Sequence, residues 1–264
     1  MPLPAPSQDT TILVTGASSG IGEAIARELA ARGYGLTLAA RRRDRLQALA
    51  RELDVPVDVL GADLASDRAR ARVIRAVRGG ERELVGVVNN AGRAGFGDVV
   101  EHDAGDEEAI FRTNALALFD LTNRLVRDLV ARGEGAILNV GSITAFAPFP
   151  HNATYAATKA FVQSFSEALH AELGGTGVSC TVVSPGPTRT PIWEASDGSG
   201  LEGLGGPLLW QSAEQVARDA VEGMVAGRRT VLPGLTNKVA SLGYRFTPRT
   251  ALLPVTRVVT KLAT

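Results

Sequence analysis

The sequence predicts an α/β fold, in which a doubly wound parallel sheet of about seven strands carries helices on both faces. Short runs rich in β-branched and apolar residues alternate along the chain with longer segments of helical periodicity. The runs are almost continuously apolar, which is typical of strands buried on both faces of a sheet. Neither an internal repeat nor a Pro/Ser-rich linker interrupts the alternation, so we expect residues 1–264 to form a single domain.

The expected strands are the short apolar runs, whose β-branched side chains suit a pleated, buried backbone. The first of them reads TILVT and the sixth reads VSCTVV. In chain order, we expect strands over residues 11–15, 35–40, 55–60, 84–88, 135–140, 178–183 and 230–232.

Between the strands, apolar side chains recur at the three- and four-residue spacing of a helix with one buried face. Consecutive parallel strands require such crossover helices, because the chain must return to the same edge of the sheet. In chain order, we expect helices over residues 20–32, 43–53, 67–78, 107–132, 155–173 and 213–226.

Two segments depart from this alternation. Residues 188–211 contain five glycines and both tryptophans of the chain. Long loops inside compact domains are often functional, and we expect this one to form a lid over a substrate. The C-terminal tail, residues 233–264, contains five basic residues and no acidic one.

The overall charge argues against one class of function. Lysine and arginine number 28, and aspartate and glutamate also number 28. A general nucleic-acid binder needs a basic excess to neutralise phosphates, so we expect no nucleic-acid partner. Apolar residues at 45% and charged residues at 21% are values of a globular rather than a disordered chain. The basic residues are 25 arginines and only three lysines.

Cysteine content and hydropathy indicate the compartment. The single cysteine, Cys180, excludes a disulfide within the chain, and His102 and His170 lack clustered ligands, so we expect no metal site. Residues 1–10 lack the basic start and apolar core of a signal peptide. No apolar run approaches the roughly 18 residues that would span a membrane. We therefore expect a soluble, cytoplasmic protein.

A glycine-rich turn follows the first expected strand directly and opens the first expected helix. It places Gly16, Gly20 and Gly22 where a tight turn needs positive φ or where a ligand must approach the backbone. The helix then presents unpaired N–H groups and a partial positive charge to a pyrophosphate. This context predicts a Rossmann-type dinucleotide site. The alternative is a tight strand-to-helix turn without a ligand.

The end of the second expected strand indicates which dinucleotide binds. A carboxylate there would bind the ribose hydroxyls of NAD, whereas Ala40 followed by Arg41 favours the 2′-phosphate of NADP. Arg42 and Arg43 are expected to be solvated at the start of the next helix. Asp63, after the third strand, either meets the adenine edge or is a turn or N-cap residue.

A second group of residues indicates acid–base chemistry. Tyr155 and Lys159 share one face of a helix, and an ammonium close to a phenol lowers the pKa of the phenol. Tyr155 would then be a general acid in carbonyl reduction and a general base in alcohol oxidation. Ser142 follows the strand that ends at Val140, so it reaches the crevice at the carboxyl edge of the sheet. The alternative is an ordinary pair on an amphipathic helix.

These motifs resemble the short-chain dehydrogenase/reductase family, in its single-domain, NADP-preferring branch. The resemblance extends over about residues 11–190. It rests on Thr15-Gly-x-x-x-Gly20-x-Gly22, Asn89-Asn90-Ala91-Gly92, Asn114, Ser142, Tyr155-x-x-x-Lys159 and Pro185-Gly186. It implies that hydride passes between the nicotinamide and a carbonyl carbon, while Tyr155 exchanges the proton and Ser142 holds the substrate oxygen. It also implies that Lys159 binds the nicotinamide ribose and that Asn114 anchors a water.

The same resemblance implies a set of cofactor contacts and an oligomer. Ser19 departs from family members that carry a second basic residue in the glycine turn, so the NADP prediction depends on Arg41. The helices around Asn114 and Tyr155 are expected at the interface of a homodimer or homotetramer. The implied cofactor contacts are Gly16, Ser18, Ser19, Gly20, Ile21, Gly22, Arg41, Asp63, Leu64, Asn90, Ala91, Gly92, Tyr155, Lys159, Pro185, Gly186 and Thr188.

The substrate is less defined than the chemistry. Aromatic side chains near the expected site indicate either an apolar substrate or packing of the lid against the body. His151, one turn before Tyr155, either lines the pocket or is a polar residue at a helix start. The aromatic residues are Phe96, Phe146, Phe149, Trp193 and Trp210.

The basic tail has three open interpretations. It could lie on an anionic membrane surface, fold over the body or form a subunit contact. Pro248 and Pro254 interrupt any long amphipathic helix, which argues against the membrane.

The leading functional prediction is an NADP-dependent oxidoreductase of an apolar carbonyl or alcohol. A 3-oxoacyl thioester reductase is the alternative within the same class. A non-catalytic, dinucleotide-sensing protein is the alternative from another class, and the intact set of Ser142, Tyr155 and Lys159 argues against it.

Overall fold

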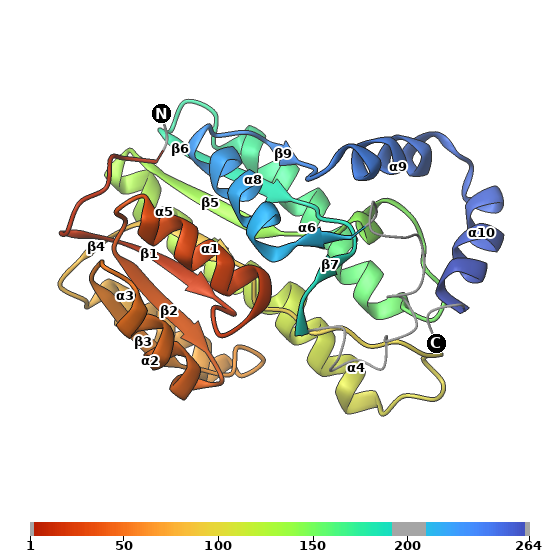
Figure 1. Ribbon diagram of the computed structural model, residues 1–264, viewed down its shortest axis with the longest axis horizontal. Coiled ribbons are helices and arrows are strands. Elements are labelled where there is room, and N and C mark those ends of the chain that lie inside the picture. Colours follow the sequence, from red (N-terminus) through yellow and green to blue (C-terminus); the bar gives the residue numbers. More distant parts are fainter. Residues whose placement is uncertain (1–2, 192–209, 262–264) are drawn as a thin grey trace.

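A computed structural model describes residues 3–191 and 210–261 and shows a seven-stranded sheet flanked by helices (Figure 1). The strand order is β3-β2-β1-β4-β5-β6-β9, and all neighbouring strands are parallel. The predicted doubly wound sheet is therefore confirmed. Its strands are β1 (Thr10–Thr15), β2 (Leu36–Ala40), β3 (Val57–Gly61), β4 (Glu83–Asn89), β5 (Gly135–Val140), β6 (Val178–Val183) and β9 (Thr230–Val231).

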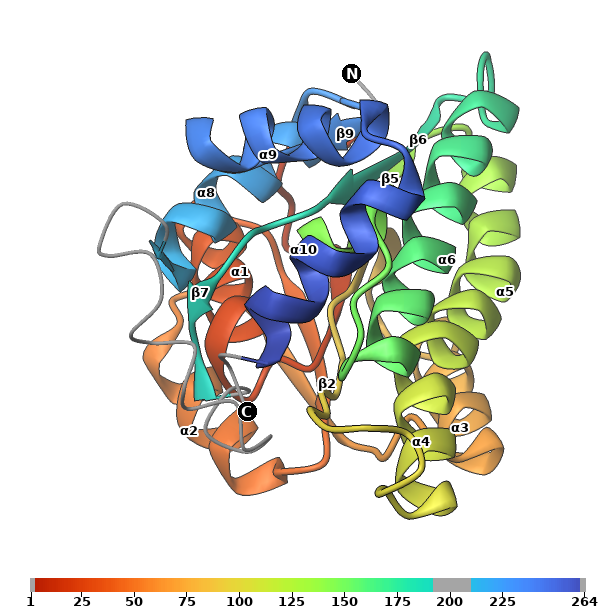
Figure 2. The same ribbon diagram turned by 90° about the vertical axis from the view of Figure 1, so that its right-hand side faces the viewer.

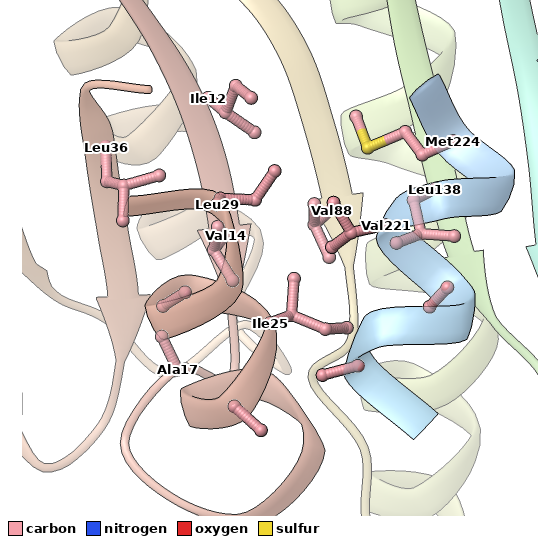
Figure 3. Close-up of a cluster of buried hydrophobic side chains, with 14 of the residues drawn as sticks. Ile12, Val14, Ala17, Ile25, Leu29, Leu36, Val88, Leu138, Val221 and Met224 are labelled. Carbon is pink, nitrogen blue, oxygen red and sulfur yellow. The ribbon is translucent and has the colours of Figure 1, made fainter. Parts of the chain in front are cut away.

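Helices cover both faces of the sheet, and alternate strand residues face the two layers. Ile12 and Val14 of β1 pack into one cluster with α1, α2 and α8 (Figure 3). Leu13 packs into the other cluster, with α3 and α5. α6 lies beside α5 on that second face (Figure 2). The helices are α1 (Gly20–Ala31), α2 (Arg43–Glu52), α3 (Asp67–Arg78), α4 (Ala104–Phe111), α5 (Ala117–Arg132), α6 (Ala153–Glu172), α8 (Ala213–Val225), α9 (Leu235–Phe246) and α10 (Arg249–Lys261).

The expected helix over residues 107–132 is wrong in detail. The helical stretch begins at Ala104 and contains a π-helical turn, Arg112–Leu116, between α4 and α5. Such a turn inserts an extra residue and often marks a functional site. Here it contains Asn114, one of the expected catalytic residues.

The two unusual segments have different outcomes. Residues 192–209 of the expected lid lie outside the described part of the chain. The ends of the lid pair with each other as a small parallel sheet, β7 (Thr188–Arg189) with β8 (Gln211–Ser212). The basic tail forms α9 and α10, for which we had predicted no helix; Pro248 separates the two. Within the described residues, none of the helices is both long and apolar enough to cross a bilayer.

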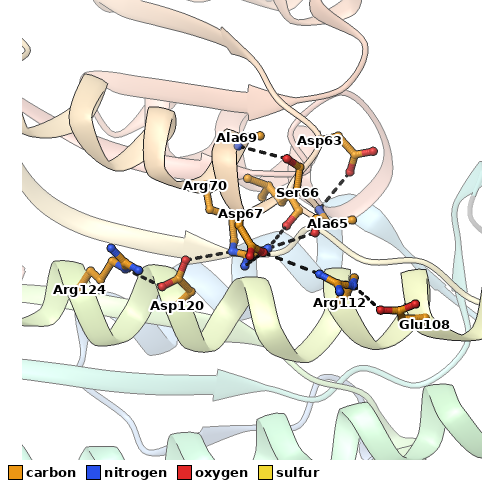
Figure 4. A network of polar contacts seen from close by, with 11 residues as sticks. Asp63, Ala65, Ser66, Asp67, Ala69, Arg70, Glu108, Arg112, Asp120 and Arg124 are labelled. Atoms are coloured by element: carbon orange, nitrogen blue, oxygen red, sulfur yellow. Dashed lines mark hydrogen bonds and ion pairs between the residues drawn. The ribbon is translucent and has the colours of Figure 1, made fainter.

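A buried arginine joins α3 to α5 and fixes the loop that precedes α3 (Figure 4). The Arg70 side chain is only 4% exposed. It donates to Asp120 Oδ2 at 3.0 Å and to the carbonyl oxygens of Leu64 at 2.9 Å and Ala65 at 3.2 Å. Burial of a guanidinium is costly unless its donors are satisfied, and here the loop carbonyls and the carboxylate satisfy them.

Replacement of Arg70 should therefore destabilise the fold. We expect Arg70→Met to lower the free energy of unfolding by about 3 kcal/mol, because it leaves buried acceptors without a donor. The matched control is Arg78→Met, which removes a second contact between the same two helices, the 2.8 Å ion pair with Asp128. Both partners of that pair are largely exposed, so we expect a loss below about 1 kcal/mol. Urea denaturation measures both values; equal losses would contradict this account of Arg70.

Candidate active site

The glycine turn between β1 and α1 is held against the end of β4. Gly16 and Gly20 adopt φ of +67° and +59°, which side chains other than glycine rarely adopt. Asn90 Nδ2 donates to the carbonyl oxygens of Thr15 at 3.0 Å and Gly16 at 3.2 Å. The Thr15 hydroxyl donates to Val88 O and accepts from the backbone N–H of Asn90. Asn90, one of the implied cofactor contacts, therefore also fixes the shape of the turn.

Gly22 is required by packing rather than by backbone conformation. A Cβ atom at this position would lie 2.2 Å from Asn90 Nδ2 and 2.4 Å from Gly16 O. The absence of that atom lets the first turn of α1 approach the strand end closely. Ile21 is partly buried against the core, and Ser19 is the N-cap of α1 without a side-chain capping bond. The turn thus leaves the N-terminus of α1 arranged as a dinucleotide site requires.

Arg41 and Arg42, the first two of the three arginines after β2, take different positions. Arg42, which we had expected to be solvated, folds back onto the glycine turn: Nη2 donates to Ser18 Oγ at 3.0 Å and to Ser19 Oγ at 2.6 Å. Desolvation and then the neighbouring cations Arg45 and Arg41 lower the pKa of Arg42. Arg41 is exposed at the end of β2. A basic group therefore does reach the glycine turn, from a different part of the chain.

The loop after β3 contains two further expected cofactor contacts. Asp63 is exposed, and its Oδ1 accepts from the backbone N–H of Ala65 at 3.1 Å. This is the turn role given above as one of its two interpretations. Leu64 is buried, and its carbonyl oxygen accepts from Arg70. The loop is thereby fixed at the carboxyl edge of the sheet, beside β2.

Tyr155 and Lys159 lie in the first turns of α6, at the carboxyl end of β5. Lys159 Nζ donates to Val140 O at 2.8 Å and lies 5.6 Å from the centroid of the Tyr155 ring. A Cβ atom on Gly92 would lie 4.0 Å from this ammonium, so the glycine keeps the space beside it open. The predicted constellation is thus assembled from β4, β5 and α6.

The pKa shifts differ from the expectation that Lys159 lowers the pKa of Tyr155. Burial raises the pKa of Tyr155, and a contact with the Ser142 hydroxyl only partly opposes this. Burial also lowers the pKa of Lys159 from 10.5 to about 8. The reason is geometric: the ammonium donates to Val140 O and lies against the ring of the tyrosine. In the protein without ligands, burial outweighs the attraction between ammonium and phenolate.

Ser142 begins the short 3-10 helix Ile143–Phe146, called η2. Its Oγ accepts from the backbone N–H of Thr144 at 3.2 Å and contacts the Thr144 hydroxyl at 3.0 Å. Ser142 is also the partner of the Tyr155 hydroxyl. The side chain is thus oriented by the start of η2, with its oxygen directed to Tyr155.

Both polar atoms of the Asn114 side chain form hydrogen bonds. Its Oδ1 accepts from the backbone N–H of Arg93 at 2.8 Å, and its Nδ2 donates to Arg93 O at 2.8 Å. Nδ2 also lies 3.3 Å from the hydroxyl of Thr158, which in turn donates to Tyr155 O at 2.7 Å. Asn114 therefore links the strand end of β4 to the helix that carries Tyr155. The sequence analysis did not single out the buried residue Thr158. The available signal was its position in the sequence, between Tyr155 and Lys159.

The segment after β6 also closes on the site. Pro185 O accepts from the backbone N–H of Ile143 at 2.9 Å, and Thr188 Oγ1 donates to Gly186 O at 2.9 Å. A Cβ atom on Gly186 would lie 2.1 Å from Oδ1 of Asn237, a buried residue of α9. Asn237 is a supporting residue that the sequence analysis missed, because nothing local connects it to the site.

His151 is paired rather than open to a pocket. Its Nδ1 lies 2.8 Å from Asp98 Oδ1, and its carbonyl oxygen accepts from the backbone N–H of Gly97. His102 holds the same loop, through Glu107 at 2.6 Å and Phe96 O at 2.9 Å. His151 therefore fixes the loop after β4 against the start of α6, and His102 fixes it against α4.

The expected aromatic residues are divided between the site and the tail. Phe149 packs edge-on against Tyr244, with ring centroids 5.9 Å apart, and Arg245 lies over the ring of Phe146 at 5.1 Å. Trp210 is buried, and Trp193 lies outside the described residues. Phe146 and Phe149 thus connect the site to α9.

Comparison with known proteins identifies the family. A family model described as short chain dehydrogenase matches residues 10–199. The sulfoacetaldehyde reductase of Chromohalobacter salexigens is 39% identical over 183 residues, which are 68% of this chain and 72% of that protein.

Solved structures agree with this match. A short-chain dehydrogenase from Sphingobium yanoikuyae in complex with NADPH is 34% identical, with a TM-score of 0.78 over 92% of this chain and 94% of that one. A 7β-hydroxysteroid dehydrogenase is 26% identical, with a TM-score of 0.83 over 94% and 96%. The chain belongs to the short-chain dehydrogenase/reductase family, and it is an oxidoreductase that acts on alcohol and carbonyl groups.

Proposed function

We propose that the protein reduces the carbonyl group of an apolar small molecule with NADPH and catalyses the reverse oxidation with NADP. The observation that carries the proposal is the group formed by Ser142, Tyr155 and Lys159 at the carboxyl edge of β5. The glycine turn beside it supplies the cofactor site, and the NADPH complex of the related Sphingobium enzyme supports the choice of cofactor.

The nicotinamide, when bound, supplies or accepts the hydride. Tyr155 supplies the proton: its raised pKa keeps the phenol protonated near neutral pH, as a general acid for carbonyl reduction requires. Ser142 donates to the same substrate oxygen and so orients it toward the phenol. The ammonium of Lys159, beside the ring, stabilises the phenolate that remains after proton transfer.

The residues of this chain fit a dinucleotide. Gly16 and Gly22 leave room for Asn90, which holds the turn at the start of α1, where backbone N–H groups would bind a pyrophosphate. Gly20 supplies a positive φ in the same turn. Gly92 leaves space next to Lys159 Nζ, where a ribose hydroxyl could accept a hydrogen bond.

Selectivity for NADP is assigned to two adjacent arginines. Arg41 is exposed beside Ala40, with no carboxylate at the strand end to repel a phosphate. Arg42 brings a second guanidinium to the hydroxyls of Ser18 and Ser19. Together they form the positive wall that a 2′-phosphate needs.

Assembly and localisation complete the proposal. Phe119 of α5 and Phe161 of α6 are both exposed and pack around Phe165, which supports a homo-oligomer formed through these helices.

The only cysteine, Cys180, is buried and its pKa is raised to about 12, which suits a reducing cytoplasm but does not require it.

Removal of the proton donor is the first test. We expect Tyr155→Phe to lower kcat for reduction of a panel of ketones and aldehydes by about 10²–10⁴-fold, with NADPH affinity nearly unchanged. The matched control is Tyr34→Phe, which removes a hydroxyl that donates to Pro4 O on the far side of α1. NADPH binding without any turnover above the Tyr155→Phe background would instead favour a non-catalytic protein. Inclusion of acyl thioesters in the panel separates the thioester reductase alternative.

A charge reversal tests cofactor choice. We expect Arg41→Asp to weaken NADPH binding about tenfold or more, because a charge-assisted hydrogen bond is lost and a repulsion gained. NADH binding should change by less than about twofold, since NADH lacks the 2′-phosphate. Arg45→Asp, on the exposed face of α2, controls for the added charge. Fluorescence titration measures each affinity; equal weakening of both cofactors would overturn the role of Arg41.

The lowered pKa of Lys159 predicts a pH dependence of stability. Between pH 8 and about 10, the unfolded chain keeps the proton on this lysine, whereas the folded chain releases it. The unliganded wild type should therefore gain stability relative to Lys159→Met as pH rises, by up to about 1.4 kcal/mol per pH unit in this window. Urea denaturation at several pH values measures the difference. Parallel curves for the two proteins would show that burial does not perturb Lys159.

A further inference from the structure

The polarity of α9 is reversed relative to an ordinary surface helix. Its buried side carries Asn237 and Ser241, each only 2% exposed. Asn237 Nδ2 donates to Pro233 O and to Gln211 Oε1, and the Ser241 hydroxyl donates to Lys238 O. The polar side of the helix is thus satisfied inside the protein, and it needs no water.

The solvent side of α9 carries a row of large apolar side chains. Leu235 is 76% exposed and Phe246 is 81% exposed, and Val239 and Leu242 lie between them, both more than half exposed. The spacing of four, three and four residues places all four within about 60° of the helix circumference. A continuous apolar stripe of this kind on the surface marks an interaction site.

The next helix shares this feature in part. In α10, Thr256 and Thr260 are buried together with Leu252, and both hydroxyls donate to carbonyl oxygens of the preceding turn. Leu253, Val255 and Val258 are exposed, although they are spread around the helix rather than aligned in one row. Both helices therefore bury polar side chains and expose several large aliphatic ones. We call the exposed apolar residues of α9 and α10 the tail face.

The charged side chains of the tail itself are all basic. Lys238, Arg249 and Arg257 are exposed, and Arg245 lies 3.6 Å from Glu167 of α6. Residues 233–264 contain no acidic side chain. The helices that carry the tail face thus combine exposed apolar side chains with exposed cations.

We propose that the tail face binds to the surface of an anionic lipid membrane. Aliphatic and aromatic side chains enter the boundary between headgroups and acyl chains, while lysine and arginine bind the lipid phosphates. A second copy of the chain fits less well, because a two-fold contact would place this acid-free segment against itself and bring like charges together. Pro248 separates α9 from α10, whereas Pro254 lies inside α10 and does not end it.

The helices α9 and α10 lie at one end of the molecule (Figures 1 and 2). α9 contacts the site through its other side: Asn237 lies against Gly186, and Tyr244 packs on Phe149. A membrane bound to α9 would therefore lie on a helix that directly contacts residues of the candidate site. Binding itself does not depend on the chemistry of Tyr155, so loss of turnover and loss of membrane binding are distinguishable.

The test is flotation of the full chain with vesicles. We expect binding to vesicles of phosphatidylglycerol and phosphatidylcholine in equal parts, little binding to phosphatidylcholine alone, and weakening by salt at about 1 M, where charges are screened within about 3 Å. The double variant Leu242→Glu/Phe246→Glu should lower the bound fraction at least about tenfold. Val100→Glu is the matched control, because Val100 is 93% exposed but lies outside the tail, and it should bind like the wild type.

A second variant covers the case in which the double glutamate variant does not fold. Arg249→Gln/Arg257→Gln keeps the apolar stripe and should weaken partitioning about fivefold for each cation removed. Light scattering after size exclusion gives the mass of every variant. Failure of the wild type to float, equal flotation of variants and control, or a smaller assembly in the glutamate variant would overturn the proposal; the last would identify a subunit contact.

Discussion

The close approach of the glycine turn to the end of β4 is the constraint on which the site depends. Asn90 can bond to the carbonyl oxygens of Thr15 and Gly16 only because neither Gly16 nor Gly22 has a side chain in the way. That contact fixes the N-terminus of α1 beside the strand end from which Gly92 follows. The glycine turn and the sheet edge that carries Ser142 are thereby held at a fixed distance from each other, as a ligand that spanned both would require.

Burial governs the chemistry at the other end of this site. Burial raises the pKa of Tyr155 and lowers that of Lys159 to about 8, so the two proton affinities move apart. The phenol therefore keeps its proton to a higher pH than the ammonium does. The link from Asn114 through Thr158 to Tyr155 O holds the helix in place, and the π-helical turn is what directs Asn114 toward it.

The C-terminal helices show that the periodicity of apolar residues does not by itself indicate which side of a helix is buried. An apolar stripe with the period of a helix ordinarily faces the core. In α9 the opposite, polar side faces inward, because Asn237 finds acceptors at Pro233 and Gln211. The core of the sheet is already filled by α1, α8, α5 and α6, so these helices add a surface rather than a core layer.

The sequence by itself determined the strands, the order of the motifs, the glycine turn and the helix of Tyr155 and Lys159. Each of these depends on residues close together in the chain: α3, for example, begins and ends where its periodicity predicts. Only the tertiary structure decided that Arg42 rather than Arg41 reaches Ser18, that a π-helical turn contains Asn114, and that the tail turns its apolar side outward. The physical reason is that these outcomes are set by hydrogen bonds and packing between segments distant in the chain, which no local period or propensity encodes.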